Sequence, residues 1–263
     1  MRKLIVIMKK EWGEVFRNRF VLFTVAFLPV IMTALPLITL WASGSTEELV
    51  GMSEADLPAR FTDLCNGLSP ASCGQYFIVS QFMMLFMLMP LAIPVTIASY
   101  SIVGEKTTRT LEPVLATPIK TWELLVGKGL AAGIPAILAT WISFLIFIAG
   151  ATFLAAGPDL LRRLLDPLWL TAVFAVGPLL ALAAVSVAVM VSSRANDPRV
   201  AEQLSMLVMI PLLGLFFAQI AGLIYINRMV ILWMALGLVV LDAVLVYFAT
   251  LLFQREVILT RWK

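Results

Sequence analysis

Few side chains in this chain of 263 residues have the chemistry of a catalytic or metal site. Histidine, the commonest general base and a common transition-metal ligand, does not occur. The two cysteines, Cys65 and Cys73, are too few for a disulfide scaffold or for a usual four-ligand zinc site. The sequence also lacks a G-x-x-x-x-G-K-[ST] phosphate-binding loop. We therefore expect no catalytic residue, no metal and no cofactor in this chain.

Asp242 is the one ionisable residue inside a stretch apolar enough to cross a membrane. A carboxylate at that depth could bind a cation or a proton, or contact a substrate. It could equally be a protonated or hydrogen-bonded group that holds helices together, because burial favours the neutral acid. We favour the structural role, since one carboxylate alone makes a poor ion pathway. An intramembrane aspartyl protease would need two carboxylates that share a proton.

The composition, 61% hydrophobic and only 13% charged, excludes an ordinary soluble domain and predicts a polytopic membrane protein. Stretches of this length in lipid must be helices, because each backbone N–H and C=O needs a partner within its own segment. We expect an all-α fold with an arm at 1–19, a six-helix membrane domain at 20–254 and a tail at 255–263. The six predicted spans are Phe20–Trp41, Tyr76–Val103, Leu130–Pro158, Pro167–Ser193, Gln203–Asn227 and Met229–Gln254.

The positions of the lysines and arginines predict how the chain is oriented. Fifteen of the 19 lie on the side that holds both termini, which places the termini in the cytoplasm. The acidic loop 42–75 is then extracytoplasmic, and it contains Cys65 and Cys73. We favour a disulfide between them over two free thiols, because that compartment permits one.

The arm is expected to form a basic amphipathic helix over residues 2–19 that lies in the membrane interface. The alternative is a merely basic lead that fixes the topology. Its apolar face would comprise Leu4, Met8, Trp12, Val15 and Phe16, and Lys10 and Glu14 are spaced for an ion pair on the opposite face.

Two of the predicted spans have features that could serve a transport path. The second carries Pro90 and Pro94, which bend a helix, and several methionines, among them Met83 and Met87. This combination suits a cavity wall, whereas each methionine alone is typical of ordinary packing. In the fifth span Gly214 and Ala218 are small residues four apart, which allow a close helix contact either in a dimer or within the bundle.

The loop 104–128 is more structured than a simple connector needs to be. Thr110 is a plausible N-cap for a short helix that reaches about Ala116, and Thr117-Pro118 is typical of a second helix start. Exposed apolar residues of the short helix, Leu111 and Leu115 among them, suit docking into a groove on a soluble partner. A loop that lies on the membrane surface is the competing interpretation.

The same loop resembles the permease signature of ABC-2 type transporters. The matching residues are Glu105, the Thr110-Leu111-Glu112 triplet, Leu115–Ile119 and the Gly127-Lys128 pair. The order of the elements resembles that family over nearly the whole chain.

The resemblance implies a permease subunit of an ABC exporter that dimerises with a copy of itself or a sister chain. A cytosolic ATP-binding cassette subunit would bind ATP and Mg²⁺ and drive transport, and spans 2 and 5 would line the path. The short helix Thr110–Ala116 would be the coupling helix. The residues expected to couple to the ATPase are Glu105, Arg109, Thr110, Leu111, Glu112, Leu115, Thr117 and Pro118.

Two other functions stay open at this point: a self-sufficient secondary transporter or channel, and a membrane scaffold without transport. Spans with so little charge, and no convincing internal repeat, disfavour the first. We expect the protein in the plasma (inner) membrane of a prokaryote, in contact with lipid and not with nucleic acid. The apolar, methionine-rich spans favour a hydrophobic or amphipathic substrate, with sodium or a peptide as alternatives.

Overall fold

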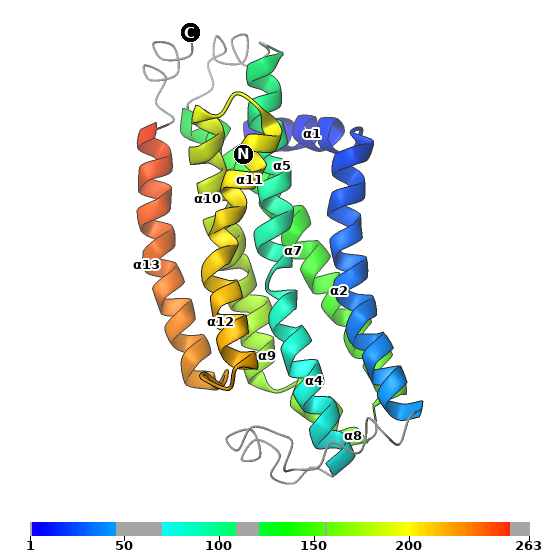
Figure 1. Ribbon diagram of the computed structural model, residues 1–263. Coiled ribbons are helices and arrows are strands. Elements are labelled where there is room, and N and C mark those ends of the chain that lie inside the picture. Colours follow the sequence, from blue (N-terminus) through cyan, green and yellow to red (C-terminus); the bar gives the residue numbers. More distant parts are fainter. Residues whose placement is uncertain (1, 46–69, 109–120, 156, 253–263) are drawn as a thin grey trace.

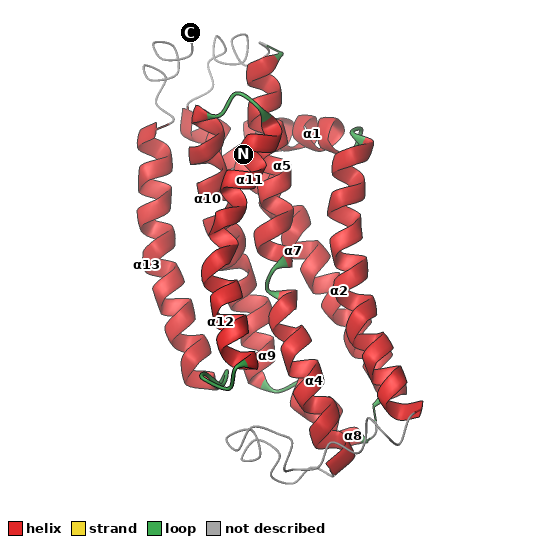
Figure 2. Ribbon diagram, viewed as in Figure 1, coloured by secondary structure: helices red, strands yellow, loops and turns green. Residues whose placement is uncertain are grey.

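The computed structural model describes residues 2–45, 70–108, 121–155 and 157–252, and within these ranges all the regular structure is helical (Figure 2). Six helical segments are long and apolar enough to cross a membrane, which confirms the predicted all-α membrane fold. A seventh helix, α1 (Arg2–Val15), precedes them, as the periodicity of the arm predicts.

The six spans contain twelve helical elements. Span 1 is α2 (Arg19–Ser45), span 2 is divided into α4 (Pro70–Phe86) and α5 (Met89–Thr107), and span 3 is α7 (Thr121–Leu154). Span 4 comprises α8 (Pro158–Leu164), α9 (Pro167–Thr171), the π-helical η2 (Ala172–Val176) and α10 (Gly177–Arg194). Span 5 comprises α11 (Pro198–Ser205), the 3₁₀-helical η3 (Met206–Met209) and α12 (Ile210–Ile220), and span 6 is α13 (Arg228–Leu252).

The spans form one bundle in which spans 2 and 4 are central. Most of the side chains of these two spans are buried, whereas most of those of spans 1, 3, 5 and 6 are half-buried or exposed. The helices α2 and α13 stand at opposite edges, and α1 lies across one end of the bundle, roughly perpendicular to the spans (Figure 1). We call this the α1 end; α5, α10 and α13 finish there and α7 begins there.

Each interruption of a span lies next to a proline, which cannot donate a backbone hydrogen bond. Span 2 breaks at Met87-Leu88, and α5 restarts with Pro90 in its first turn. The π-helical turn η2 comes directly before Gly177-Pro178, and the 3₁₀ turn η3 comes before Pro211. The bend predicted for span 2 is therefore real, but it lies ahead of Pro90 and not at Pro94, which sits inside α5.

Several predicted boundaries are wrong. Span 3 ends at Leu154 and not at Pro158, because Pro158 occupies the first turn of α8, where a missing N–H costs nothing. Span 2 begins at Pro70, six residues before the predicted start at Tyr76, so the predicted loop 42–75 is shortened from both sides. The predicted loop 104–128 is shortened in the same way, since α5 continues to Thr107 and α7 begins at Thr121.

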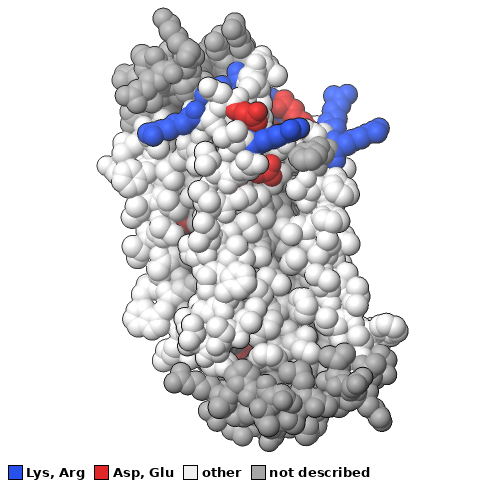
Figure 3. Space-filling view, in the orientation of Figure 1, with Lys and Arg blue, Asp and Glu red and all other residues white. Residues whose placement is uncertain are grey.

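Charged side chains of the described residues gather at the α1 end, and the middle of the molecule is almost free of them on the face that Figure 3 shows. This arrangement fits an apolar band between two aqueous surfaces. Which surface faces the cytoplasm stays a prediction from the lysine and arginine count.

Candidate functional site: a buried ion cluster at the α1 end

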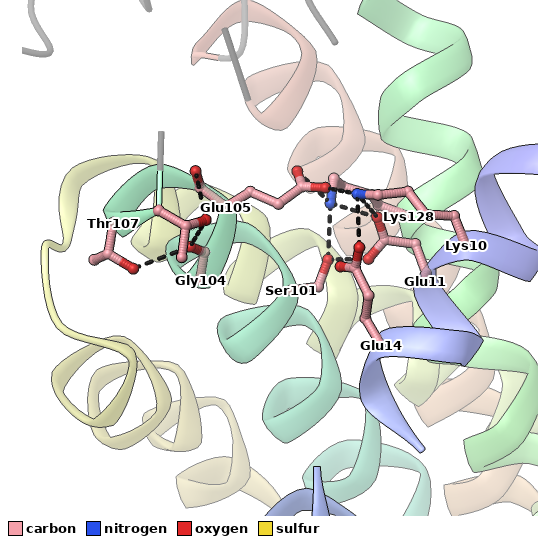
Figure 4. A network of polar contacts seen from close by, with 9 residues as sticks. Lys10, Glu11, Glu14, Ser101, Gly104, Glu105, Thr107 and Lys128 are labelled. Atoms are coloured by element: carbon pink, nitrogen blue, oxygen red, sulfur yellow. Dashed lines mark hydrogen bonds and ion pairs between the residues drawn. The ribbon is translucent and has the colours of Figure 1, made fainter. Parts of the chain in front are cut away.

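Three helices bring charged side chains together at the α1 end (Figure 4). The ammonium group of Lys128, in the second turn of α7, lies 2.7 Å from Oε1 of Glu11 and 2.8 Å from Oε2 of Glu105. It also donates to the hydroxyl of Ser101, over 2.8 Å, and that hydroxyl donates to the second oxygen of Glu11. We call Glu11, Ser101, Glu105 and Lys128 the ion cluster; they come from α1, α5 and α7.

Lys10 forms the outer part of this arrangement. Its ammonium group pairs with Glu105 and lies 3.7 Å from Glu11 and 3.4 Å from Glu14, four residues further along α1. The predicted Lys10–Glu14 pair is thus present, as one edge of a larger network. The carboxylates of Glu11, Glu14 and Glu105 could in principle hold a metal ion, but the ammonium groups of Lys10 and Lys128 are bound to them.

The cluster is buried, although its members are ionisable. Glu11 is 2% exposed, and Glu105 and Lys128 are each 4% exposed. Burial alone would raise the pKa of Glu11, but the charge of Lys128 and the hydrogen bonds from Lys128 and Ser101 outweigh it and hold that pKa below its ordinary value of 4.5. The carboxylate of Glu105 raises the pKa of Lys10 above 10.5, against the opposing effect of partial burial. Glu11 therefore stays a carboxylate at neutral pH.

The local sequence places the side chains of the ion cluster on the helix faces that meet at the α1 end. Ser101 and Glu105 are four residues apart and so share one face of α5. Gly127 lets α1 approach α7 closely: a Cβ at this position would come within 2.8 Å of Cγ2 of Ile7. The indole N–H of Trp12 donates to the carbonyl of Ala131 over 2.9 Å, which fixes α1 along α7.

Two residues of the ion cluster, Glu105 and Lys128, lie at opposite ends of the predicted loop 104–128. Glu105 is in the last turn of α5 before residues 109–120, and Lys128 is in the second turn of α7 after them. Next to Glu105, Lys106 donates to the carbonyl of Ala195, at the end of α10, over 3.0 Å. The two ends of the loop are therefore joined to each other, to α1 and to span 4.

The structure describes only part of the predicted coupling set. Glu105 is turned inward, in the ion cluster. The other predicted coupling residues lie outside the described residues, so their role and the Thr110–Ala116 helix stay predictions: Arg109, Thr110, Leu111, Glu112, Leu115, Thr117 and Pro118.

Sequence reasoning missed Glu11, and with it the cluster. The predicted apolar face of α1 was rotated from the real one: Ile7, Glu11 and Val15 are buried, whereas Phe16 is 44% exposed. A signal was present, because Glu11 stands four residues after Ile7 and four before Val15, as an acid in an apolar row. From the sequence, Lys128 belongs to the Gly127-Lys128 pair of the motif and has no predicted partner.

The predicted transport-path residues are divided between the core and the surface. Met83, Met87, Pro90 and Pro94 are buried in the packing of span 2. Gly214 is exposed with open space around it, and Ala218 is half-buried. Asp242 is 3% exposed, in α13. Their part in a transport path stays a prediction.

The predicted disulfide is described only at one of its ends. Cys73 is buried in the first turn of α4, and Cys65 lies outside the described residues. The pairing of Cys65 with Cys73 stays a prediction.

Six apolar spans, a helix laid across one end and an ion cluster that joins the ends of a loop are the features of a polytopic membrane protein. The family of ABC-2 family transporter proteins matches the chain over residues 5–250. The chain therefore belongs to this family and is a membrane permease component of an ABC transporter. A comparison with curated proteins gave no match.

Proposed function

We propose that this chain is the membrane-spanning subunit of an ABC exporter, driven by ATP hydrolysis in a separate cytosolic subunit. In this proposal the α1 end faces the cytoplasm of a prokaryotic cell, and the ATPase subunit, which binds ATP and Mg²⁺, docks on the loop between α5 and α7. The carboxylate at position 105 and its neighbours pass the motion of the ATPase to the spans.

The observation that carries the proposal is the connection of both loop ends through the ion cluster. A force on residues 109–120 acts on α5 and α7 together, because Glu105 and Lys128 are bound 2.8 Å apart. It also acts on α1, through Glu11. The helix α5 belongs to the central span, so its displacement changes the packing of the bundle interior. A channel or scaffold has no comparable need for such a linked loop.

The exposed side of span 5 supports a dimer with a copy of this chain or a sister chain. Gly214 leaves open space on α12, and large apolar side chains stand beside it, including Phe217, 64% exposed, and Ile220, 50% exposed. Small residues at such a surface let two helices approach closely in lipid. Two copies joined there would place spans 5 around the axis, where a shared path can form.

The test combines purification with charge reversal. The protein is extracted in mild detergent with candidate ATPase subunits, and complex formation and substrate-stimulated ATP hydrolysis are measured. We expect Glu105→Lys and Glu112→Lys to lower the stimulated hydrolysis while insertion in the membrane stays normal. Asp159→Lys, an exposed acid on α8 far from the cluster, is the matched control and should leave hydrolysis unchanged. Unchanged coupling in both loop variants, or the absence of any ATPase complex, would refute the proposal.

A further inference from the structure

Asp242 is a buried acid whose charge the described structure does not balance. It lies near the middle of α13 and is 3% exposed, and neither of its carboxylate oxygens has a hydrogen-bond partner among the residues that the structure describes. A carboxylate taken out of water without a partner is strongly destabilised, so the group must carry a proton or meet a positive charge. The ion cluster does not involve it.

The elements packed against α13 offer little to neutralise this acid. The segment η2 carries no ionisable side chain, nor does α9, and the one on α10 is Arg194, in its last turn at the α1 end. On α7 Lys128 is already bound to Glu11 and Glu105. Any positive charge at the level of Asp242 would therefore have to come from outside this part of the chain.

An apolar groove lies between α7, α10 and α13, the helix that carries the acid. Its volume is about 350 Å³, within the range of small-molecule sites, and its lining is almost entirely apolar. Residues from all three helices line it, among them Gly133, Ile137, Pro178, Ala181, Val246 and Ala249.

The acid and the groove share one face of α13. Asp242, Val246 and Ala249 are spaced i, i+4 and i+7, so Asp242 lies on the same face as the two lining residues and one helical turn before Val246. Four residues of helix correspond to about 6 Å along the axis. Opposite unit charges at that separation, with an effective dielectric constant of about 20, attract strongly enough to change a binding constant by about a hundredfold.

We propose that the groove and Asp242 form a binding site for a hydrophobic organic cation, with a proton on the acid when the site is empty. The apolar body of the ligand fills the groove, and its positive charge replaces the proton as the partner of the carboxylate. The inference names a substrate class and in that sense rests on the proposed transport function. Binding of the cation can be measured on this chain without an ATPase, so a chain that fails to bind it would not contradict the proposed coupling to an ATPase.

The experiment uses the purified full-length chain in lipid nanodiscs, without an ATPase. The probe is tetraphenylphosphonium, whose charge is permanent, and triphenylphosphine oxide serves as an uncharged probe of similar build. Equilibrium dialysis measures both. We expect Asp242→Asn to weaken binding of the cation at least about tenfold and to leave binding of the neutral probe unchanged.

A second variant tests the groove. A Cβ at Gly133 would meet nothing within 4 Å, so Gly133→Leu places its side chain in the groove without a clash at the backbone. It should weaken binding of both probes. Asp159→Asn, at the exposed surface of α8, is the control and should bind both as the unchanged chain does. Equal binding of the cation by the Asp242→Asn chain would overturn the proposal, as would a groove filled only by lipid acyl chains that the cation does not displace.

Carbodiimide labelling gives a readout that does not depend on a variant folding. Dicyclohexylcarbodiimide reacts with protonated carboxyl groups in apolar surroundings, and mass spectrometry locates the adduct. We expect label on Asp242 in the unchanged chain, and a clear fall in its rate when tetraphenylphosphonium is present. Labelling at the same rate with and without the cation would show that the acid takes part in no cation site.

Discussion

Replacing Lys128 by methionine tests whether the ion cluster holds α1 on the bundle. The change removes the buried ammonium group that lies 2.7 Å from Glu11 and 2.8 Å from Glu105, while a side chain of similar length remains. Each of these contacts corresponds to about 6 kcal/mol of attraction at an effective dielectric constant of about 20, and most of that repays the cost of desolvation. Since two buried carboxylates then face each other with only Lys10 beside them, we expect a loss of about 3–5 kcal/mol.

Hydrogen exchange of the α1 amides measures this loss, because α1 exchanges when it leaves the bundle. A loss of 3–5 kcal/mol makes exchange of residues 2–15 faster by a factor of roughly 10² to 10⁴. Lys9→Met removes an exposed lysine from the same helix and should change exchange by less than about threefold. Adding Glu11→Gln to Lys128→Met should restore part of the protection, because one unbalanced carboxylate is removed. Equal exchange in the Lys128→Met and Lys9→Met proteins would refute the reasoning.

Two further predictions concern the same contact. Gly127→Val forces a side chain against Ile7 and should destabilise α1 docking by about 1–3 kcal/mol, seen as faster exchange of α1; Gly13→Ala, at an exposed position with open space, should instead slow it slightly. Low pH should release α1 as well. Because the pKa of Glu11 is lower in the folded protein than its ordinary value of 4.5, its carboxylate contributes a stabilisation that is complete above pH 4.5. That stabilisation is lost as the pH falls through the pKa of Glu11 in the folded protein. The stability difference between the unchanged chain and Glu11→Gln, followed by exchange between pH 7 and 3, should therefore be constant near neutrality and shrink below pH 4.5; a difference that does not shrink would contradict this assignment.

The sequence determined the spans better than it determined their ends. Long apolar runs identify helices in lipid whatever their neighbours are, because the backbone must satisfy itself. Boundaries depend on the roles of single residues: the apolar run predicts that span 3 ends at Pro158, although Pro158 starts α8. The break at Met87-Leu88 and the turn η2 both lie near prolines, so an irregularity at each place could be expected from the sequence. That the second would be a π-helical turn could not.

The ion cluster could not be predicted from periodicity, since it depends on tertiary contacts. Glu11 and Lys128 are 117 positions apart, and Lys10 and Glu105 are 95 apart. Each residue alone is an ordinary charge on a basic arm or in a polar loop. Only the placement of α1 across α7, allowed by Gly127, turns Glu11 inward. Sequence can indicate that an acid interrupts an apolar face, but its partner is found only when the helices are in place.

A buried cluster of this kind is a poor means of gaining stability, and that is the reason to assign it a role in positioning. Three well-packed apolar side chains at Glu11, Glu105 and Lys128 would hold the helices together as firmly, without the cost of desolvation. Apolar packing would tolerate sliding of α1 along α7, whereas charge-assisted hydrogen bonds near 2.7 Å fix one register. The loop between α5 and α7 thus starts and ends on helices that keep a fixed relation to each other and to α1. In the coupling that we propose, this fixed relation lets a displacement of the loop reach span 2 without sliding between α1, α5 and α7.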